Sequence, residues 1–337
     1  MRKYVYLICC LVFLFIGCEL KHKDKDSSKK NNDSPAVLNK TEKDEIYEGY
    51  LSILAQGKDL NYIDEEGSLR GWEGTPLTMA TNDGYIDIVE EFLSKGADIN
   101  GYDGLGSTPL LIAIENCNID MVELLVNKGA DVNKREYEED ENIYNDHEEK
   151  FYGRKAPLHK AIQTGSKQMV QLLIENGADV NSKYDYDGSA LNDARLRAED
   201  KGIVKMLINA GAQASIYDYT FIGDIEEVKK CLSNDENIIN KEDVVGYTAL
   251  HVAALEGYEE IANLLIIKGA DINAQDISGD TPLMYAVMHS HKKVVELLLD
   301  NNADIDLKNY YGKTALLISI EINNKEIQKM IMDNERR

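Results

Sequence analysis

A phrase of the type Thr-Pro-Leu recurs along the chain at a nearly fixed interval. Its second position is occupied in turn by Pro76, Pro109, Pro157, Ala190, Ala249, Pro282 and Ala315. Four of the six steps between these positions are 33 residues long, and the other two are 48 and 59. A unit of this length is one supersecondary motif that buries its apolar face only against neighbouring units. The spacing therefore predicts a chain built as a stack of repeats.

Each unit contains signals for two short helices. Thr75 and Thr108 are suited to cap a helix start, and the proline that follows fits the first turn because it lacks an N–H group. Gly84, Gly165 and Gly257 separate two helical patterns, where the chain needs a residue with positive φ. A closing phrase, Gly-Ala-Asp followed by an apolar residue and Asn, then leads into the next unit. We therefore expect an all-α chain of helix pairs joined by extended finger loops.

The phrases "APLHKA" from Ala156 and "TALHVA" from Thr248 resemble the ankyrin repeat most closely. The resemblance covers almost everything after Asp44. It implies an all-α ankyrin-repeat solenoid of paired antiparallel helices, with a concave side lined by the first helices and the finger tips. It also implies that the chain binds proteins.

Irregular spacings mark the special units. The 59-residue step predicts a repeat that has lost about eight finger residues, and with them part of its contact to the next unit. In the final unit, charged residues replace part of the outer apolar stripe, as a terminal cap requires. The predicted organisation is an N-terminal cap at 44–66, repeats at 67–100, 101–133, 149–181, 182–214, 241–273 and 274–306, a degenerate repeat at 215–240 and a C-terminal cap at 307–334.

The 48-residue step contains an insertion at 134–152, where one finger tip belongs. It carries eight acidic and three basic residues. Two interpretations remain open: the insertion steers a basic partner toward the stack, or it is a solvated loop without a function.

The N-terminus has the pattern of a secretory signal. Two positive charges precede an apolar run from Tyr4 to Ile16, which is too short to span a bilayer as a helix. Phe15 stands where ordinary cleavage before Cys18 would need a small side chain. "LFIGC" instead resembles a bacterial lipobox, which implies a signal peptide at 1–17 and lipidation of Cys18, including palmitate. The alternative is that Cys18 ends the apolar run by chance.

The resemblance to a lipoprotein implies a location in the bacterial cell envelope, on its periplasmic or outer-surface face. Residues 18–43 would then be a flexible tether, because this polar segment has too few apolar residues to fold. The formal net charge of −23 would repel a phosphate backbone, so nucleic acid is not expected as a partner. A protein with a basic surface fits this charge better.

No pattern for catalysis, a metal or a cofactor is present. His159 and His251 occupy the fourth position of the repeated phrase, where the ankyrin resemblance implies a structural hydrogen bond. His289 and His291 lack an adjacent third ligand, and the "DYDG" phrase at 185–188 fails the spacing of a calcium loop. We therefore predict no catalytic residue, no metal and no cofactor.

Two groups of residues are candidates for protein binding. Aromatic side chains at predicted finger tips are suited to interfaces because they supply rigid contact area; codon bias is the alternative explanation for the many tyrosines. This finger-tip group consists of Trp72, Tyr102, Tyr137, Tyr144, Tyr184, Tyr186, Tyr310 and Tyr311. The second group is an apolar patch on the first helices of late repeats, which packing in the core would explain equally well. It consists of Val252, Leu255, Tyr285, Met288 and Ile318.

The sequence thus predicts a membrane-anchored, non-catalytic protein–protein interaction module. A structural or protective scaffold of the envelope, without a defined docking site, is the alternative. An enzyme is the interpretation with the least support.

Overall fold

The computed structural model describes residues 40–62, 74–137, 155–184, 188–196 and 199–334. The predicted signal peptide, Cys18 and most of the predicted tether lie outside these residues. The chain divides into two compact units, unit 1 at 1–140 and unit 2 at 141–337, which are described separately below.

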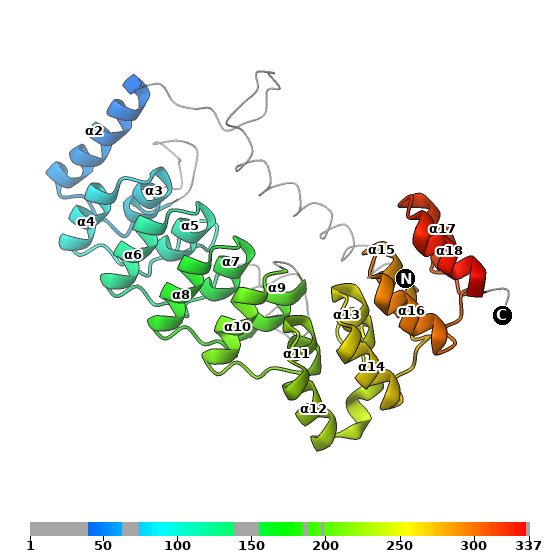
Figure 1. The fold of residues 1–337 in the computed structure, drawn as a ribbon. Helices are drawn as coiled ribbons and strands as arrows, with labels where there is room; N and C mark the ends of the chain where they lie inside the picture. Colours follow the sequence, from blue (N-terminus) through cyan, green and yellow to red (C-terminus); the bar gives the residue numbers. More distant parts are fainter. Residues whose placement is uncertain (1–39, 63–73, 138–154, 185–187, 197–198, 335–337) are drawn as a thin grey trace, which may run out of the picture. The chain divides into compact units, whose positions relative to one another are not determined.

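The described part of unit 1 consists of one long helix followed by two helix pairs (Figure 1). Its helices are α2 (Lys40–Gln56), α3 (Pro76–Asp83), α4 (Ile86–Ser94), α5 (Pro109–Glu115) and α6 (Ile119–Asn127). First helices pack on first helices, as α3 does on α5, and each also packs on the second helix of its own pair. The apolar core lies between these two layers.

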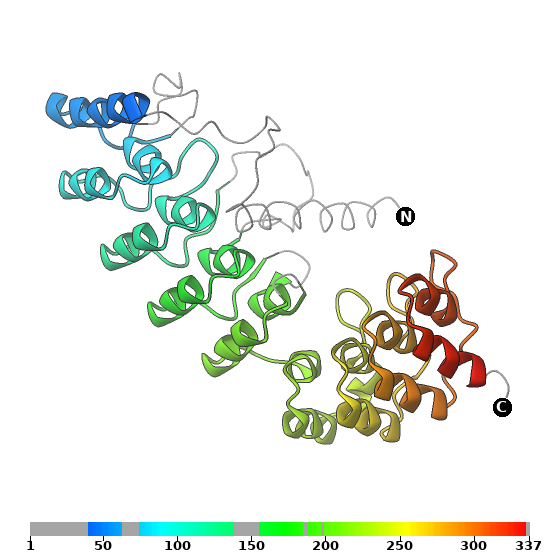
Figure 2. The same ribbon diagram turned by 45° about the horizontal axis from the view of Figure 1, so that its top comes forward.

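Unit 2 continues the same architecture through six helix pairs in its described part, with one short hairpin (Figure 2). Its elements are α7 (Pro157–Gln163), α8 (Lys167–Glu175), β1 (Lys183–Tyr184), β2 (Gly188–Ser189), α9 (Ala190–Leu196), α10 (Lys201–Asn209), α11 (Ile216–Ile222), α12 (Ile225–Asn234), η1 (Glu236–Asn240), α13 (Ala249–Glu256), α14 (Glu259–Ile267), α15 (Pro282–Met288), α16 (Lys292–Asp300), α17 (Ala315–Glu321) and α18 (Lys325–Asn334). The antiparallel strands pair Lys183 with Ser189. The predicted all-α repeat solenoid is confirmed.

The helix starts follow the predicted chemistry. The hydroxyls of Thr75, Thr108 and Thr281 accept a hydrogen bond from the backbone N–H three residues further on, and a proline opens each helix. These bonds satisfy backbone donors that the first turn of a helix leaves without a partner. The side chains of the repeated phrase therefore fix where each first helix begins.

The turn between the two helices of a pair requires a left-handed residue. Gly84, Gly165 and Gly257 have φ values of 80°, 71° and 76°, as the sequence predicted. Three repeats place a non-glycine residue there: Cys117 with φ 54°, Ser290 with φ 59° and Asn323 with φ 55°. This conformation is sterically unfavourable for a residue that carries a Cβ atom, whereas glycine adopts it without strain.

Asparagine side chains join the closing phrases of adjacent repeats. In each case the carboxamide oxygen accepts the backbone N–H of a residue one repeat later, at 2.7 to 2.9 Å. The donor and acceptor residues are Asp98 and Asn61, Asp131 and Asn100, Gln213 and Asn181, Asp271 and Asn240, and Asp304 and Asn273. A one-residue slip between repeats would break this bond, so it fixes their register.

Helix α2 covers the N-terminal side of the helix pairs of unit 1 by packing on α4. The Tyr50 ring is buried edge-on against Phe92, and its hydroxyl donates to Asp83 Oδ2 at 2.9 Å. The helix begins at Lys40, so the predicted tether is wrong in its last four residues. The sequence there, Lys-Thr-Glu-Lys, is rich in good helix formers that can extend a helix already held by packing.

The C-terminal end, where the sequence predicts a cap with charged residues in part of its outer apolar stripe, also has exposed apolar side chains. Leu317, Ile320 and Met332 are exposed on α17 and α18, although charged residues occupy other positions of the same helices. Charged residues of α18 such as Lys329 and Asp333 are exposed as well.

The left-handed position gives a test of the local energetics. Cys117→Gly should raise the free energy of unfolding of unit 1 by about 0.5–1 kcal/mol, because the steric cost of φ 54° exceeds the extra chain entropy of glycine. Urea denaturation checks this value. Glu123→Gly, at an exposed position inside α6, is the control and should lower stability by about 1 kcal/mol. Equal losses in both variants would contradict the strain at Cys117.

Candidate protein-binding surface

The fingers of unit 2 are built on one short turn that repeats. Asp243, Asp276 and Asn309 each use Oδ1 to accept two backbone N–H groups, from the residues two and four positions later, at 2.8 to 3.1 Å. A glycine with positive φ follows in each turn, as at Gly279 with φ 77°. The side chain thus folds the finger back on itself and exposes the one or two residues at its tip.

Neighbouring fingers are joined by backbone hydrogen bonds. The Ile277 N–H donates to Val245 O at 3.4 Å, and the Tyr310 N–H donates to Ser278 O at 2.9 Å. In Figure 2 the yellow, gold and orange loops that lead into α13, α15 and α17 project from the same side of unit 2. These bonds hold consecutive tips at the spacing of one repeat.

Large apolar side chains occupy the three joined tips. We call the exposed residues Val244, Ile277, Tyr310 and Tyr311 the finger-tip row. Tyr310 is the most exposed, at 77%. Burial of apolar surface against a partner is energetically favourable. A continuous row of exposed apolar side chains therefore marks a candidate interaction site.

In the described part of unit 1, one finger has the same construction. Asp103 Oδ1 accepts the N–H groups of Leu105 and Ser107, which leaves Leu105 exposed at the tip. The Tyr137 N–H donates to Gly106 O at 2.8 Å, and the ring of Tyr137 is also exposed. Burial raises the pKa of Asp103, while the two N–H groups oppose that shift.

The predicted finger-tip group divides into three sets. Tyr310, Tyr311 and Tyr137 are exposed at finger tips in the structure. Trp72, Tyr144 and Tyr186 lie outside the described residues.

Tyr102 and Tyr184 form the third set, because the structure contradicts their placement at exposed tips. Both are half-buried. The Tyr102 hydroxyl donates to Arg135 O at 3.1 Å, and the Tyr184 hydroxyl donates to Asp193 Oδ1 at 2.6 Å. Each ring therefore lies along the side of its finger and stabilises it.

The predicted apolar patch is also wrong as an exposed surface. Val252 and Ile318 are buried, and Leu255, Tyr285 and Met288 are half-buried. The reason is that first helices of adjacent repeats pack side by side, as α13, α15 and α17 do, so this position lies between them. Packing in the core, the alternative left open by the sequence, explains these residues.

Tyr285 instead stabilises a finger through hydrogen bonds of its hydroxyl group. Its hydroxyl donates to Asp276 Oδ2 at 2.7 Å and lies 2.9 Å from the hydroxyl of Tyr247. Because the single proton of Tyr285 is used toward Asp276, Tyr247 is the donor to Tyr285. Burial, followed by the nearby Tyr247, raises the pKa of Tyr285, so this hydroxyl remains a donor. Two tyrosines thus fix the finger that carries Ile277.

The sequence analysis did not identify the aliphatic tip residues Leu105, Val244 and Ile277. A usable signal was present, because each lies directly after, or two residues after, the Asp of an Asp-x-x-Gly phrase in the repeat register. The aromatic residues were identified because the chain contains unusually many tyrosines. Three aliphatic residues give no such signal in a chain that is rich in aliphatic residues.

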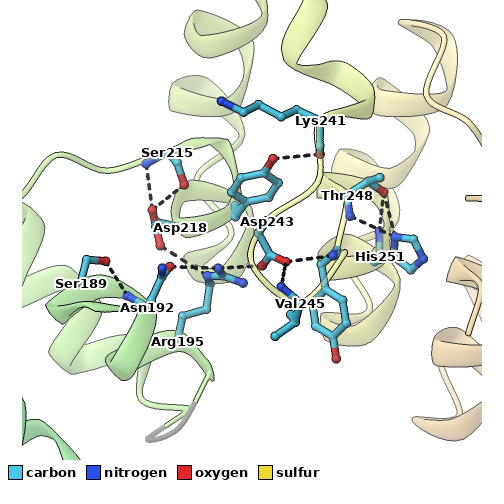
Figure 3. Close-up of polar contacts among 12 residues, drawn as sticks. Ser189, Asn192, Arg195, Ser215, Asp218, Lys241, Asp243, Val245, Thr248 and His251 are labelled. Atoms are coloured by element: carbon cyan, nitrogen blue, oxygen red, sulfur yellow. Dashed lines mark hydrogen bonds and ion pairs between the residues drawn. The ribbon is translucent and has the colours of Figure 1, made fainter. Parts of the chain in front are cut away.

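A buried ion-pair cluster lies where the finger of the degenerate repeat is missing (Figure 3). The connection from α10 to α11 consists only of residues 210–215, compared with 268–281 between α14 and α15. Arg195 on α9 reaches across this place. Its Nη2 donates to Asp243 Oδ2 at 2.9 Å, and its Nε lies 3.4 Å from Asp218 Oδ1. The three side chains are almost fully shielded from solvent.

Each carboxylate of the cluster is held by further donors. Asp218 Oδ2 accepts from the N–H and hydroxyl of Ser215, and Asp243 also forms the finger turn described above. The Tyr217 hydroxyl donates to Lys241 O at 2.8 Å. Burial, with Asp243 close by, raises the pKa of Tyr217 to about 12. The cluster therefore ties the repeats at 182–214 and 241–273 together around the shortened one.

The histidines play the structural part that the sequence predicted. His159 Nε2 donates to Ser182 O and His251 Nε2 donates to Asp280 O, both at 3.1 Å, so each imidazole contacts the finger of the next repeat. The Thr248 N–H donates to His251 Nδ1 at 3.1 Å, which requires the neutral ring. Burial lowers the pKa of His251 accordingly. These contacts use the imidazoles for packing and provide no acid–base pair.

Among the residues that the structure describes, no cluster of three or more His, Cys, Asp or Glu side chains has the geometry to hold a metal ion. None of the described helices combines the length and the apolar character needed to cross a bilayer.

Comparison with known proteins agrees with the repeat geometry. The family described as ankyrin repeats (3 copies) matches residues 45–136 and 139–218, and ankyrin repeats (many copies) matches 250–299 and 283–330. A stretch of 50 residues is 54% identical to the acyl-CoA-binding domain-containing protein 6 homolog of Dictyostelium discoideum. This stretch is 15% of the chain and covers 17% of that relative's length. A match shorter than two repeats carries no conclusion about ligands.

The junction at Arg195 can be tested by removing its charge. Arg195→Met should destabilise unit 2 by about 3–5 kcal/mol, because two buried carboxylates would lose their counter-ion. Urea denaturation gives the loss, and hydrogen exchange in α9, α11 and α13 shows where protection disappears. Lys205→Met, at an exposed position on α10, is the matched control and should change stability by less than about 0.5 kcal/mol. A loss below about 1 kcal/mol for Arg195→Met would show that the cluster does not hold the repeats together.

Proposed function

Because the chain belongs to the ankyrin-repeat family, we propose that it is a non-catalytic protein-binding module whose docking edge is the finger-tip row. The observation that carries this proposal is the exposure of four large apolar side chains on fingers joined by backbone hydrogen bonds. The edge is preorganised by side-chain-capped turns, so little entropy is lost when a partner binds.

The charge near the finger-tip row favours a partner whose contact surface has an apolar centre surrounded by basic residues. Glu242, Asp271, Asp304 and Asp306 are exposed in the segments that flank the fingers, while Lys241 and Lys308 are the nearby exposed bases. The net charge of −23 has the same sign. Complementary charge accelerates the encounter, and the apolar row then supplies most of the affinity.

The acidic insert at 134–152 contributes to the same encounter in this proposal. Its first described residues lead from the closing phrase of unit 1 to Tyr137, and its remaining residues lie outside the described part. Eight acids against three bases would attract a basic partner over several ångströms and weaken as salt rises.

The location follows from the N-terminal sequence. The phrase "LFIGC" supports lipidation of Cys18 and anchoring in a bacterial cell envelope. Several acyl chains, at about 0.8 kcal/mol per buried CH₂, would hold the chain at a membrane essentially permanently. The polar residues after Cys18 would then separate the repeats from the lipid surface.

The docking edge can be located with a photo-crosslinking amino acid in cells. Placed at Ile277 or Tyr310, it should give one saturable adduct, because a defined partner covers the row. Placed at Glu296, an exposed position on α16, it should not give that adduct. The same set of adducts from all three positions would contradict a defined docking edge.

Once the partner is identified, the contribution of the finger-tip row to the binding free energy can be measured. The double variant Tyr310→Ala, Tyr311→Ala should weaken binding at least about tenfold, since aromatic side chains at the centre of an interface dominate affinity. Ile267→Ala removes an equally exposed apolar residue from α14 and serves as the control, with affinity unchanged.

The anchor has its own test. Cys18→Ala should leave the chain uncleaved or release it from the membrane fraction, because neither lipidation nor processing at this residue could occur. Detergent partitioning and the mass of the mature N-terminus report the result. Unchanged partitioning of the variant together with an unmodified Cys18 in the parent would exclude the anchor, and it would leave the binding edge unaffected.

A further inference from the structure

The finger-tip row has a regular spacing that restricts the shape of its partner. Val244, Ile277 and Tyr310 lie directly after the Asp or Asn that forms each turn, and they are 33 residues apart in the chain. Their side chains are 47%, 42% and 77% exposed, on loops that project from one side of unit 2 (Figure 2). The row therefore presents one large side chain of the same register at each repeat step.

Two features of the structure give the length of that step. The first helices α13, α15 and α17 pack side by side, and packed helices lie about 8–10 Å apart. Each finger contributes two passes of the chain, and hydrogen bonds join neighbouring fingers; hydrogen-bonded chains lie about 4.8 Å apart. Both features give a distance of about 10 Å between neighbouring tips.

A step of this length matches the α-helix. About seven residues of a helix rise about 10.5 Å and return nearly to the same face. In an extended strand, about three residues cover this distance, and side chains three residues apart point to opposite faces. A helix laid along the row can therefore contact all three tips with one apolar stripe, whereas a strand cannot.

The hydrogen bonds of the tips also favour a helix. Most tip N–H groups are already used: those of Ile277 and Tyr310 donate to the preceding finger, and those of the two residues that follow in each turn donate back to its Asp or Asn. A partner strand binds through such backbone donors, and a polyproline segment also has carbonyl groups without internal partners. An α-helix satisfies its own backbone groups, so it needs only the apolar contact that the row offers.

We propose that the partner lays an amphipathic α-helix along the finger-tip row, with an apolar stripe that recurs about every seven residues and with lysine or arginine beside it. This inference rests on the proposed docking function of the row. To reach from Val244 to Tyr310 the helix needs about 15 residues, or about four turns. Its basic residues complement the exposed acids beside the fingers, such as Glu242 and Asp304.

Two fluorescent peptides made of alanine, lysine and three leucines test the shape of the partner. In the aligned peptide the leucines share one face of the helix at the spacing of the row, and in the control peptide of equal composition they are spread around the helix. Anisotropy with the full chain should give a dissociation constant at least about tenfold lower for the aligned peptide. Ile277→Lys should remove this preference, whereas Ile267→Lys, at an exposed apolar position on α14, should retain it. Equal affinity of the parent for both peptides would overturn the helix.

Cross-links to the cellular partner distinguish the helix from the docking function. A photo-crosslinking amino acid placed in turn at Val244, Ile277 and Tyr310 should mark partner residues about seven apart within one segment, as read by mass spectrometry. Marks about three residues apart would indicate an extended segment, and marks in separate segments would indicate an irregular surface. Either result would overturn the helix and leave the docking edge intact. The absence of a defined adduct from all three positions would overturn the docking edge itself, and the helix with it.

Discussion

Most of the described helices of this protein are too short to be stable alone. They have seven to ten residues, well below the length at which an isolated helix forms in water. Each helix pair is therefore stable only because neighbouring pairs cover its apolar sides. The capping threonines, the left-handed residue between helices and the asparagine bond between closing phrases make each pair fit the next one in a single register. A side of a pair that lacks a neighbour must be covered by a cap, as α2 covers α4, or it stays exposed.

The degenerate repeat shows how the stack tolerates a missing part. Loss of a finger removes backbone hydrogen bonds and the tip that would contact the next finger. Arg195 occupies that place and contacts Asp218 and Asp243 on the two following repeats. A buried ion pair adds little net stability over apolar packing, but it tolerates few alternative arrangements because an unpaired buried charge is costly. The cluster therefore replaces the finger contact that would have fixed the register of these repeats. It does not replace apolar packing in the core. The contact to the next unit, which the sequence predicts to be partly lost, is supplied here by Arg195.

The sequence predicted the features that a single repeat contains. Helix starts at Thr75 and Thr108, the left-handed Gly84 and the contacts of His251 depend on residues within one phrase or one neighbour, so their periodicity is visible. Features that depend on which side of a helix meets its neighbour were not predictable in the same way. Whether Val252 is exposed or buried depends on how closely the first helices of adjacent repeats approach each other. That distance could not be predicted from the amino-acid composition.

Hydroxyl partners were missed for a similar reason. Tyr184 has the same residue type as Tyr310, yet one donates to Asp193 and is half-buried while the other extends into solvent. The difference lies in the availability of an acceptor on the adjacent first helix. Arg195 was overlooked because a basic residue on an acidic chain has many possible partners, and only the shortened connection brings these two carboxylates to it.

In the proposed binding function, the acidic flanks of the finger-tip row favour a basic partner, so rising salt would weaken the encounter. The row consists of side chains that the repeat pattern places beyond the reach of any neighbouring repeat of the described chain. The stack thus exposes these apolar side chains as a consequence of its own packing rule.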